Sequence, residues 1–151
     1  MLGTLNEEQI DRVLRSEVIG RIGCHAEGRT YVVPITYAYD GTSVYGHSVE
    51  GLKLRLMRAN PQVCFEVDHM ETMANWQSVI AWGTFEELHG EAAYKAMQAL
   101  VNRLLPLLVS ETSQPAHGRE PSRAHGAATG GQPAVVYRLL LGEKTGRFEK
   151  R

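Results

Sequence analysis

The chain has 151 residues and a formal net charge of −1; 43% of its residues are hydrophobic and 22% are charged. This composition is that of a soluble globular domain long enough to bury a core without staples. The near-neutral charge argues against nucleic acid as the main partner, and the apolar runs are too short to span a membrane. The N-terminus has neither the basic nor the apolar segment of a secretion signal. We therefore expect one cytoplasmic domain over residues 1–151, with its two cysteines as free thiols.

The N-terminal segment predicts a short helix. Asn6 is a typical N-cap residue, and Gln9 stands three positions later, where it completes a capping box. Leu5 and Ile10 can form a hydrophobic staple across the start of this helix. The apolar residues that follow have helical spacing.

After this helix the hydrophobic period becomes that of strands. Residues 18–24 predict a first strand, and residues 30–39 predict the clearest one, with aromatic and branched residues in alternation. Pro34 removes a backbone donor from that strand, which places it at an edge, a bulge or a ligand. Asp40-Gly41 predicts a hairpin turn, and residues 43–47 predict the returning strand.

The rest of the chain continues this mixture of strands and helices. The expected elements are a short helix over 51–59, a half-buried strand over 62–68, a long strand over 77–88, the main helix from 90 to about 109 and a final strand over 134–141. Residues 112–133, rich in Gly, Pro and Ser, predict a flexible loop, and a charged tail is expected after residue 141. Six strands joined by short turns predict a mainly β fold, a six-stranded antiparallel barrel with flanking helices.

The segment 47–53 has the residue types of an anion site. A strand ends, a turn of small residues follows, and a helix begins with Lys53 in its first turn. Free N–H groups at the helix start, the helix dipole and the side chains of His47, Ser48 and Lys53 can converge on one phosphate. Gly51 would let the backbone approach such a ligand closely. Such turns are common, and spacing alone favours an ordinary turn with a solvated lysine over the phosphate site.

Several segments together carry a family resemblance. They are residues 31–37, 45–61, 62–68, 77–83 and 143–147. Their order and spacing resemble the pyridoxamine 5'-phosphate oxidase-like family of FMN-binding split β-barrels, in which 45–61 would be the phosphate-binding turn. Lys53 stands where that family has a phosphate-binding lysine, whereas Leu52 replaces the second basic residue. His47-Ser48 and the strand 31–37 are more similar to the nitroimidazole-reductase branch.

The resemblance implies an FMN-binding oxidoreductase that reduces a small electrophilic substrate through bound flavin, with NAD(P)H as a candidate electron donor. It also implies a homodimer with the flavin at the interface. The implied cofactor-binding residues are Val33, Pro34, Ile35, Thr36, His47, Ser48, Gly51, Leu52, Lys53, Trp76, Gln77 and Ser78. The first four would follow the flavin ring edge. The other wall would come from a partner, through residues 75–77 or the tail 144–147; in a monomer, the loop 112–133 would cover the flavin instead.

Other functions stay open on the same fold, because fold alone does not fix chemistry. A haem- or flavin-binding carrier or sensor is one alternative, and a deazaflavin-dependent reductase is another. His47 is the one candidate for a catalytic residue, through substrate contact, or for an axial haem ligand. The other five histidines have no metal-ligand spacing, so no metal site is predicted. The sequence does not decide between a catalyst and a binding protein.

Overall fold

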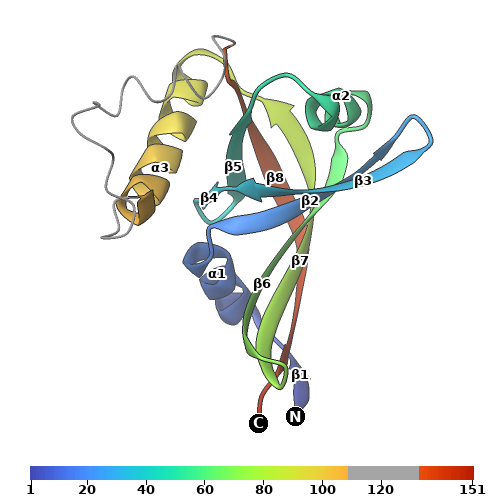
Figure 1. The fold of residues 1–151 in the computed structure, drawn as a ribbon, viewed down its shortest axis with the longest axis vertical. Helices are drawn as coiled ribbons and strands as arrows, with labels where there is room; N and C mark the ends of the chain where they lie inside the picture. The colour runs from blue at the N-terminus through green and yellow to red at the C-terminus, as the bar shows by residue number, and fades with distance from the viewer. Residues whose placement is uncertain (109–132) are drawn as a thin grey trace.

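The computed structural model describes residues 1–108 and 133–151, and the eight strands in these ranges form one antiparallel sheet (Figure 1). In chain order the elements are β1 (Leu2–Thr4), α1 (Glu7–Ser16), β2 (Ile19–Ala26), β3 (Arg29–Thr36), β4 (Ala38–Tyr39), β5 (Ser43–Ser48), α2 (Leu52–Ala59), β6 (Gln62–Thr72), β7 (Asn75–Glu87), α3 (Gly90–Leu108) and β8 (Val135–Glu149). The strand order is β3-β2-β6-β7-β8-β5-β4, and β1 pairs with β8.

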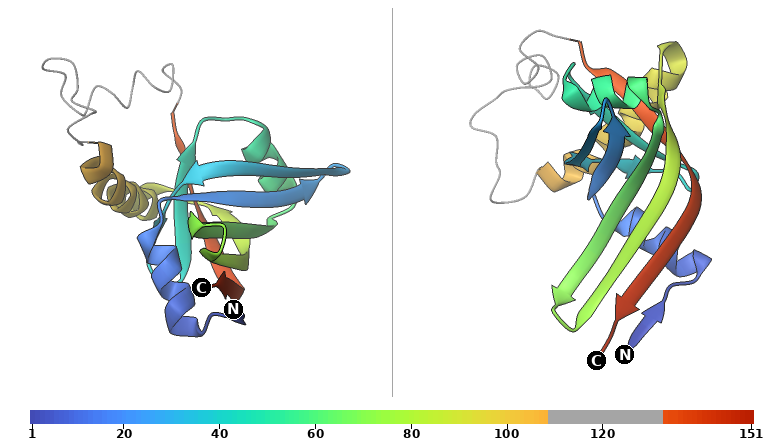
Figure 2. Two further views of the ribbon diagram at one scale, coloured as in Figure 1. Left: turned by 60° about the horizontal axis from the view of Figure 1, so that its bottom comes forward. Right: turned by 90° about the vertical axis from the view of Figure 1, so that its right-hand side faces the viewer.

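The sheet curls but does not close, because β3 and β4 at its two ends are not paired with each other. Six strands are long, while β1 and β4 have only three and two residues. The predicted class, a mainly β split barrel with six principal strands and flanking helices, is therefore confirmed. The long strands β6, β7 and β8 run side by side toward the end where both termini lie (Figure 2).

Helix α1 begins as the capping box predicts. The Asn6 side chain accepts a hydrogen bond from the Gln9 backbone N–H at 2.9 Å, and the Gln9 side chain accepts one from the Asn6 N–H at 2.8 Å. Leu5 and Ile10 on either side of the cap are buried. The Tyr37 hydroxyl donates to the Leu14 carbonyl oxygen at 2.7 Å, which ties α1 to the sheet.

The core fills the inside of the curled sheet. Its largest fully buried side chains are Leu14, Ile22, Tyr37, Val44, Leu54, Leu56, Met57, Phe65, Val67, Tyr137 and Leu139. Tyr37 meets Phe65 edge to face, with ring centroids 5.0 Å apart. Cys24 is buried, Cys64 is half-buried, and neither forms a disulfide, as predicted.

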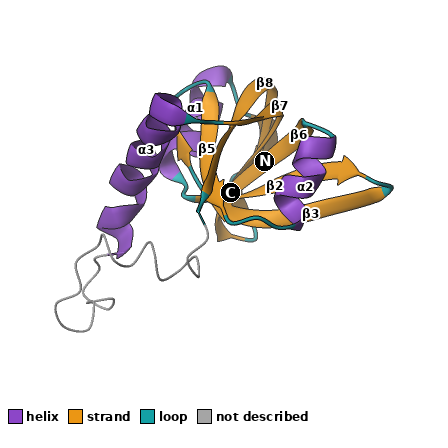
Figure 3. Cartoon of the chain, turned by 90° about the horizontal axis from the view of Figure 1, so that it is seen from above, coloured by secondary structure: helices purple, strands orange, loops and turns teal. Residues whose placement is uncertain are grey.

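Helices α2 and α3 flank different parts of the sheet (Figure 3). Helix α2 packs against β2, and α3 packs against β4, β5 and β8. Arg58 of α2 forms ion pairs with Glu50 and Glu87, and Arg55 forms one with Glu27. These pairs hold α2 to the β5–α2 turn, to β7 and to the β2–β3 hairpin.

Two sequence expectations are wrong in detail. The charged tail expected after residue 141 belongs to β8, because β7 provides an antiparallel partner as far as Glu149. The charged residues of this segment favoured an exposed tail, but its backbone pairs with β7, and Gly146 is buried against Leu5. The helical spacing of Tyr94, Met97, Val101, Leu104 and Leu108 predicts all five on the apolar stripe of α3, but Tyr94 is 64% exposed. The predicted loop 112–133 lies outside the described residues except for its last position.

Candidate functional site

The β5–α2 turn leaves the start of a helix open. Gly51 is the N-cap residue of α2 and has an extended backbone, and no side chain accepts a hydrogen bond from the first turn. The first helical turn of α2 also contains no acidic residue. The first N–H groups of a helix need acceptors, and its dipole favours negative charge there. The turn is therefore suited to an anion.

Lys53 adds a positive charge to this turn. Its side chain is half-buried, and burial lowers the pKa of its ammonium group. Glu50, the nearest acidic residue in the chain, is bound by Arg58 at 2.6 Å instead. Within the described ranges, no carboxylate forms an ion pair with Lys53. A half-buried cation without a counter-charge is costly, so Lys53 and the open helix start favour the same kind of ligand.

His47 and Thr36, which are far apart in the sequence, line one pocket. This pocket has a volume of about 360 Å³ and lies between the sheet and α3. Ser48 follows His47 at the end of β5, and successive strand residues point to opposite faces. The Ser48 hydroxyl donates to the Val49 carbonyl oxygen at 2.8 Å. The structure thus separates two side chains that the sequence grouped at one phosphate.

Strand β3 lies at the edge of the sheet and pairs only with β2, as the position of Pro34 predicts. Pro34 and Thr36 are on its exposed face, whereas Val33 and Ile35 pack against the core. The side chains of Val33 and Ile35 therefore cannot reach a ligand on the exposed face. Only their backbone groups are available to a flavin at this edge.

Residues 76–78 lie at the start of β7, away from the pocket of His47. Trp76 and Gln77 line a different pocket of about 280 Å³, together with His69 and Phe148. The Trp76 indole N–H donates to the Glu149 carboxylate at 3.2 Å. A single chain does not bring these residues to Thr36 and His47.

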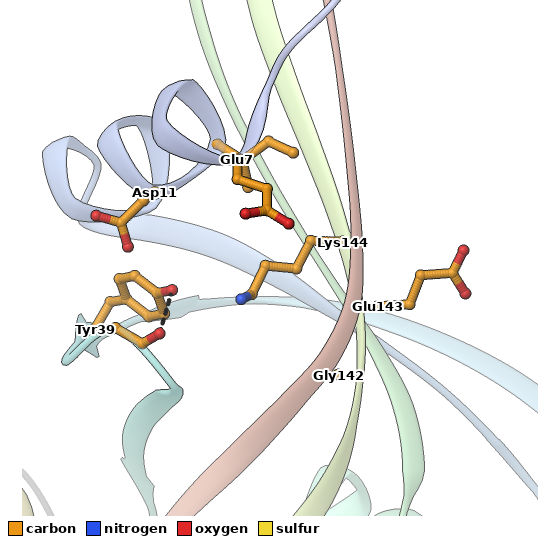
Figure 4. Close-up of a pocket in the computed structure, with 8 residues that line it drawn as sticks. Glu7, Asp11, Tyr39, Gly142, Glu143 and Lys144 are labelled. Carbon is orange, nitrogen blue, oxygen red and sulfur yellow. Dashed lines mark hydrogen bonds between the residues drawn. The ribbon is translucent and has the colours of Figure 1, made fainter.

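A further pocket of about 450 Å³ lies between α1, β4 and β8 (Figure 4). The Lys144 side chain extends into it, whereas Glu143 points away. Burial and the nearby Asp11 raise the pKa of Tyr39 to about 12, so this phenol stays protonated at neutral pH. None of the predicted site residues lines this pocket.

Sequence reasoning missed the α3 wall of the His47 pocket. Met97, Leu100 and Leu104 contribute to it. The only signal was the apolar run at the end of the helix, which is richer in leucine than one buried stripe requires.

In residues 1–108 and 133–151, no group of three or more His, Cys, Asp or Glu side chains is placed to hold a metal ion. No described helix has the length and apolar character needed to cross a membrane.

An antiparallel sheet that curls without closing is consistent with a split barrel. The pyridoxamine 5'-phosphate oxidase family model matches residues 6–147, and the chain belongs to this family. An uncharacterized protein from Rhizobium meliloti (strain 1021) is 32% identical over 84 residues; these are 56% of this chain and 56% of that protein.

Solved structures show the same fold. A FAD-binding protein from Mesorhizobium loti is 29% identical, with a TM-score of 0.75 and 99% of each chain covered. A FAD-binding protein from Mycobacterium smegmatis is 22% identical, with a TM-score of 0.67, 99% of this chain and 100% of that chain covered. A proposed 5-nitroimidazole antibiotic resistance protein from Bacteroides thetaiotaomicron is 17% identical, with a TM-score of 0.68, 98% of this chain and 89% of that chain covered. The resemblance seen in the sequence is confirmed at the level of family and fold.

Proposed function

We propose that the protein binds FMN through the β5–α2 turn and acts as a cytoplasmic flavin-dependent oxidoreductase that reduces a small electrophilic substrate, with NAD(P)H as the candidate electron donor. The observation that carries this proposal is Lys53, a half-buried cation without a carboxylate partner in the described residues, beside the uncapped start of α2. A phosphate would supply both the counter-charge and the acceptors that the helix start needs. The FAD-binding relatives of the same fold support a flavin as the group that carries this phosphate.

The residues around the turn fit the rest of the cofactor. When bound, FMN supplies the hydride and electron transfer, and the protein supplies position and electrostatics. The outer edge of β3 offers backbone groups to a ring system, and Thr36 adds a hydroxyl on the exposed face. His47 can hold a proton at a ring nitrogen in the neighbouring pocket.

FMN fits this turn better than FAD on the charges present. The turn offers one lysine and one helix start, which match a single terminal phosphate. Leu52 stands where the sequence resemblance expects a second basic residue, so one cation rather than two would hold this phosphate. Extraction and chromatography of the flavin would distinguish FMN from FAD.

We further propose that the working unit is a homodimer. Trp76, Gln77 and Ser78 do not reach the pocket of Thr36 and His47 within one chain. A second copy would bring its own residues 76–78 against the flavin and bury the exposed side of the ring. A two-fold dimer would then have two equivalent sites.

The experiment for the cofactor is spectroscopic. The purified protein, and apo-protein titrated with FMN, FAD or riboflavin, would be followed by absorbance and flavin fluorescence. We expect a flavin spectrum and an affinity for FMN at least tenfold above that for riboflavin, which lacks the phosphate. Equal affinities would refute the phosphate anchor, a Soret band would favour haem, and binding of deazaflavin alone would favour the deazaflavin reductase.

The experiment for the dimer is a dilution series followed by sedimentation and flavin fluorescence. A site shared between two copies links flavin affinity to dimerisation by mass action. We expect flavin to be released as the dimer dissociates. A monomer that keeps FMN at full affinity would refute the shared site.

A further inference from the structure

The pocket of Thr36 and His47 is built almost entirely from apolar side chains. Of the eleven residues in the described part of the chain that line it, nine are apolar, and seven of these come from α3. They are Val18, Ile19, Met97, Leu100, Val101, Leu104, Leu105, Leu107 and Leu108. The volume of about 360 Å³ falls in the range of small-molecule sites.

The two polar residues of the pocket come from the strands that we assign to the flavin site. Thr36 ends β3, and His47 lies one residue before the end of β5. Neither a carboxylate nor an ammonium or guanidinium group lines this pocket in the described part of the chain, and His47 is the one titratable lining residue. A charged ligand would lose its hydration here without gaining an opposite charge.

The apolar wall is larger than the packing of α3 requires. Leu100 is fully buried and anchors the helix, but Leu105 is 38% exposed, Leu107 is 51% exposed, and Ile19 across the pocket is 50% exposed. Isolated exposed apolar side chains are ordinary, whereas a group of them around one concave site indicates an interaction surface. These side chains would lose their contact with water when an apolar molecule enters.

We propose that this pocket binds the substrate, and that the substrate is a neutral, mostly apolar small molecule with one hydrogen-bonding group directed at Thr36 and His47. The inference rests on the proposed flavin function, because it places the substrate beside the ring edge along β3. The α3 wall would then determine specificity, since it excludes charged molecules and accepts apolar ones.

The test uses prodan, a neutral naphthalene with one carbonyl group whose emission shifts to the blue in apolar surroundings. Its binding would be measured on apo- and FMN-loaded full-length protein, with 1-anilinonaphthalene-8-sulfonate as an anionic comparison. Val101→Arg would place a charge in the pocket, and Leu104→Gln would add an uncharged polar group. Gln98→Arg adds the same charge at an exposed position of α3 outside the pocket and is the matched control.

We expect FMN-loaded protein to bind prodan with a blue shift and at least tenfold more tightly than the sulfonate. Val101→Arg and Leu104→Gln should each weaken prodan binding at least tenfold, and Gln98→Arg should change it less than twofold. If FMN displaced prodan, the pocket would belong to the flavin itself, and the proposal that it binds the substrate would be overturned. Absence of prodan binding, or equal binding of the sulfonate, would also overturn it.

The flavin titration separates this inference from the function on which it rests. If FMN does not bind but prodan follows the expected pattern in the variants, the flavin function is refuted and the class of ligand is supported. If FMN binds with the expected preference over riboflavin and prodan does not bind, only the substrate inference is refuted. The variants would be compared by circular dichroism, so that loss of fold is not mistaken for loss of the pocket.

Discussion

Lys53→Met should change stability and flavin affinity in opposite directions. Methionine keeps the length and apolar stem of lysine but removes the charge. In the apo-protein, the half-buried ammonium of Lys53 has no ion-pair partner in the described residues, and burial lowers its pKa. Removing that charge should therefore stabilise the apo-protein, while removing the group that we assign to the phosphate should weaken FMN binding.

The size of each effect follows from these surroundings. Relief of a half-buried unpaired charge should raise the free energy of unfolding by about 0.5–1 kcal/mol, as for other stabilising changes at functional positions. A hydrogen bond to a charged group contributes about 1.5–3 kcal/mol. Its loss should weaken FMN binding by about tenfold to a hundredfold.

Urea unfolding of the apo-protein and fluorescence titration with FMN would measure the two effects. Lys95→Met is the matched control, because Lys95 is exposed on α3 and pairs with Glu91 at 3.4 Å. It should change the free energy of unfolding by less than about 0.5 kcal/mol and leave FMN affinity unchanged. A Lys53→Met variant that is destabilised and binds FMN normally would show that Lys53 has a structural role, and would refute the phosphate assignment.

Three further predictions concern stability, each measured by urea unfolding. Gly46→Ala should lower the free energy of unfolding by about 1–3 kcal/mol, because the new Cβ would lie 2.5 Å from the Tyr137 hydroxyl oxygen. A decrease of less than about 0.5 kcal/mol would contradict this packing. Tyr137→Phe should not destabilise the protein, because the buried hydroxyl has no hydrogen-bond partner among the described residues. Burial and the neighbouring Asp68 raise the pKa of Glu66 to about 7. The folded-state pKa exceeds the unfolded value, so this group stabilises the fold at low pH, and the contribution is lost as pH rises from about 4.5 through 7. Between pH 5 and 8 the free energy of unfolding should therefore fall less in Glu66→Gln than in the native protein, by about 1 kcal/mol. This is less than the raised pKa alone would give, because the Glu66 side chain is 29% exposed. An unchanged dependence of stability on pH would refute the raised pKa of Glu66.

The sequence predicted those features that depend on neighbours along the chain. The capping box of Asn6 and Gln9, the edge position that Pro34 requires and the helix start after Gly51 all follow from local chemistry, and the structure contains each of them. The fold class followed from the six alternating strands and their short turns, and the location of the β5–α2 turn followed from the helix start after Gly51.

The features that the sequence did not predict depend on contacts between distant segments. The wall of α3 faces His47 only because β5 and β8 lie between this helix and the core. The separation of His47 from Ser48 arises because β5 extends one residue beyond the predicted strand 43–47, where Ser48 pairs with Val135 of β8. The strand character of residues 142–149 likewise depends on the length of β7, the partner strand.

The exceptions to local rules gather around one part of the sheet. Helix α2 begins without a side-chain cap, and Lys53 is half-buried without a carboxylate partner in the described residues. Close by in the chain, His47 faces a pocket whose other walls are almost entirely apolar. Sequences are otherwise consistent with their folds, and departures that cost stability concentrate at functional sites. By contrast, α1 at another part of the sheet has a complete capping box and an acidic first turn. Because these features lie at the β5–α2 turn and at the pocket of His47, a flavin phosphate at the turn and an apolar substrate in the pocket would explain them together.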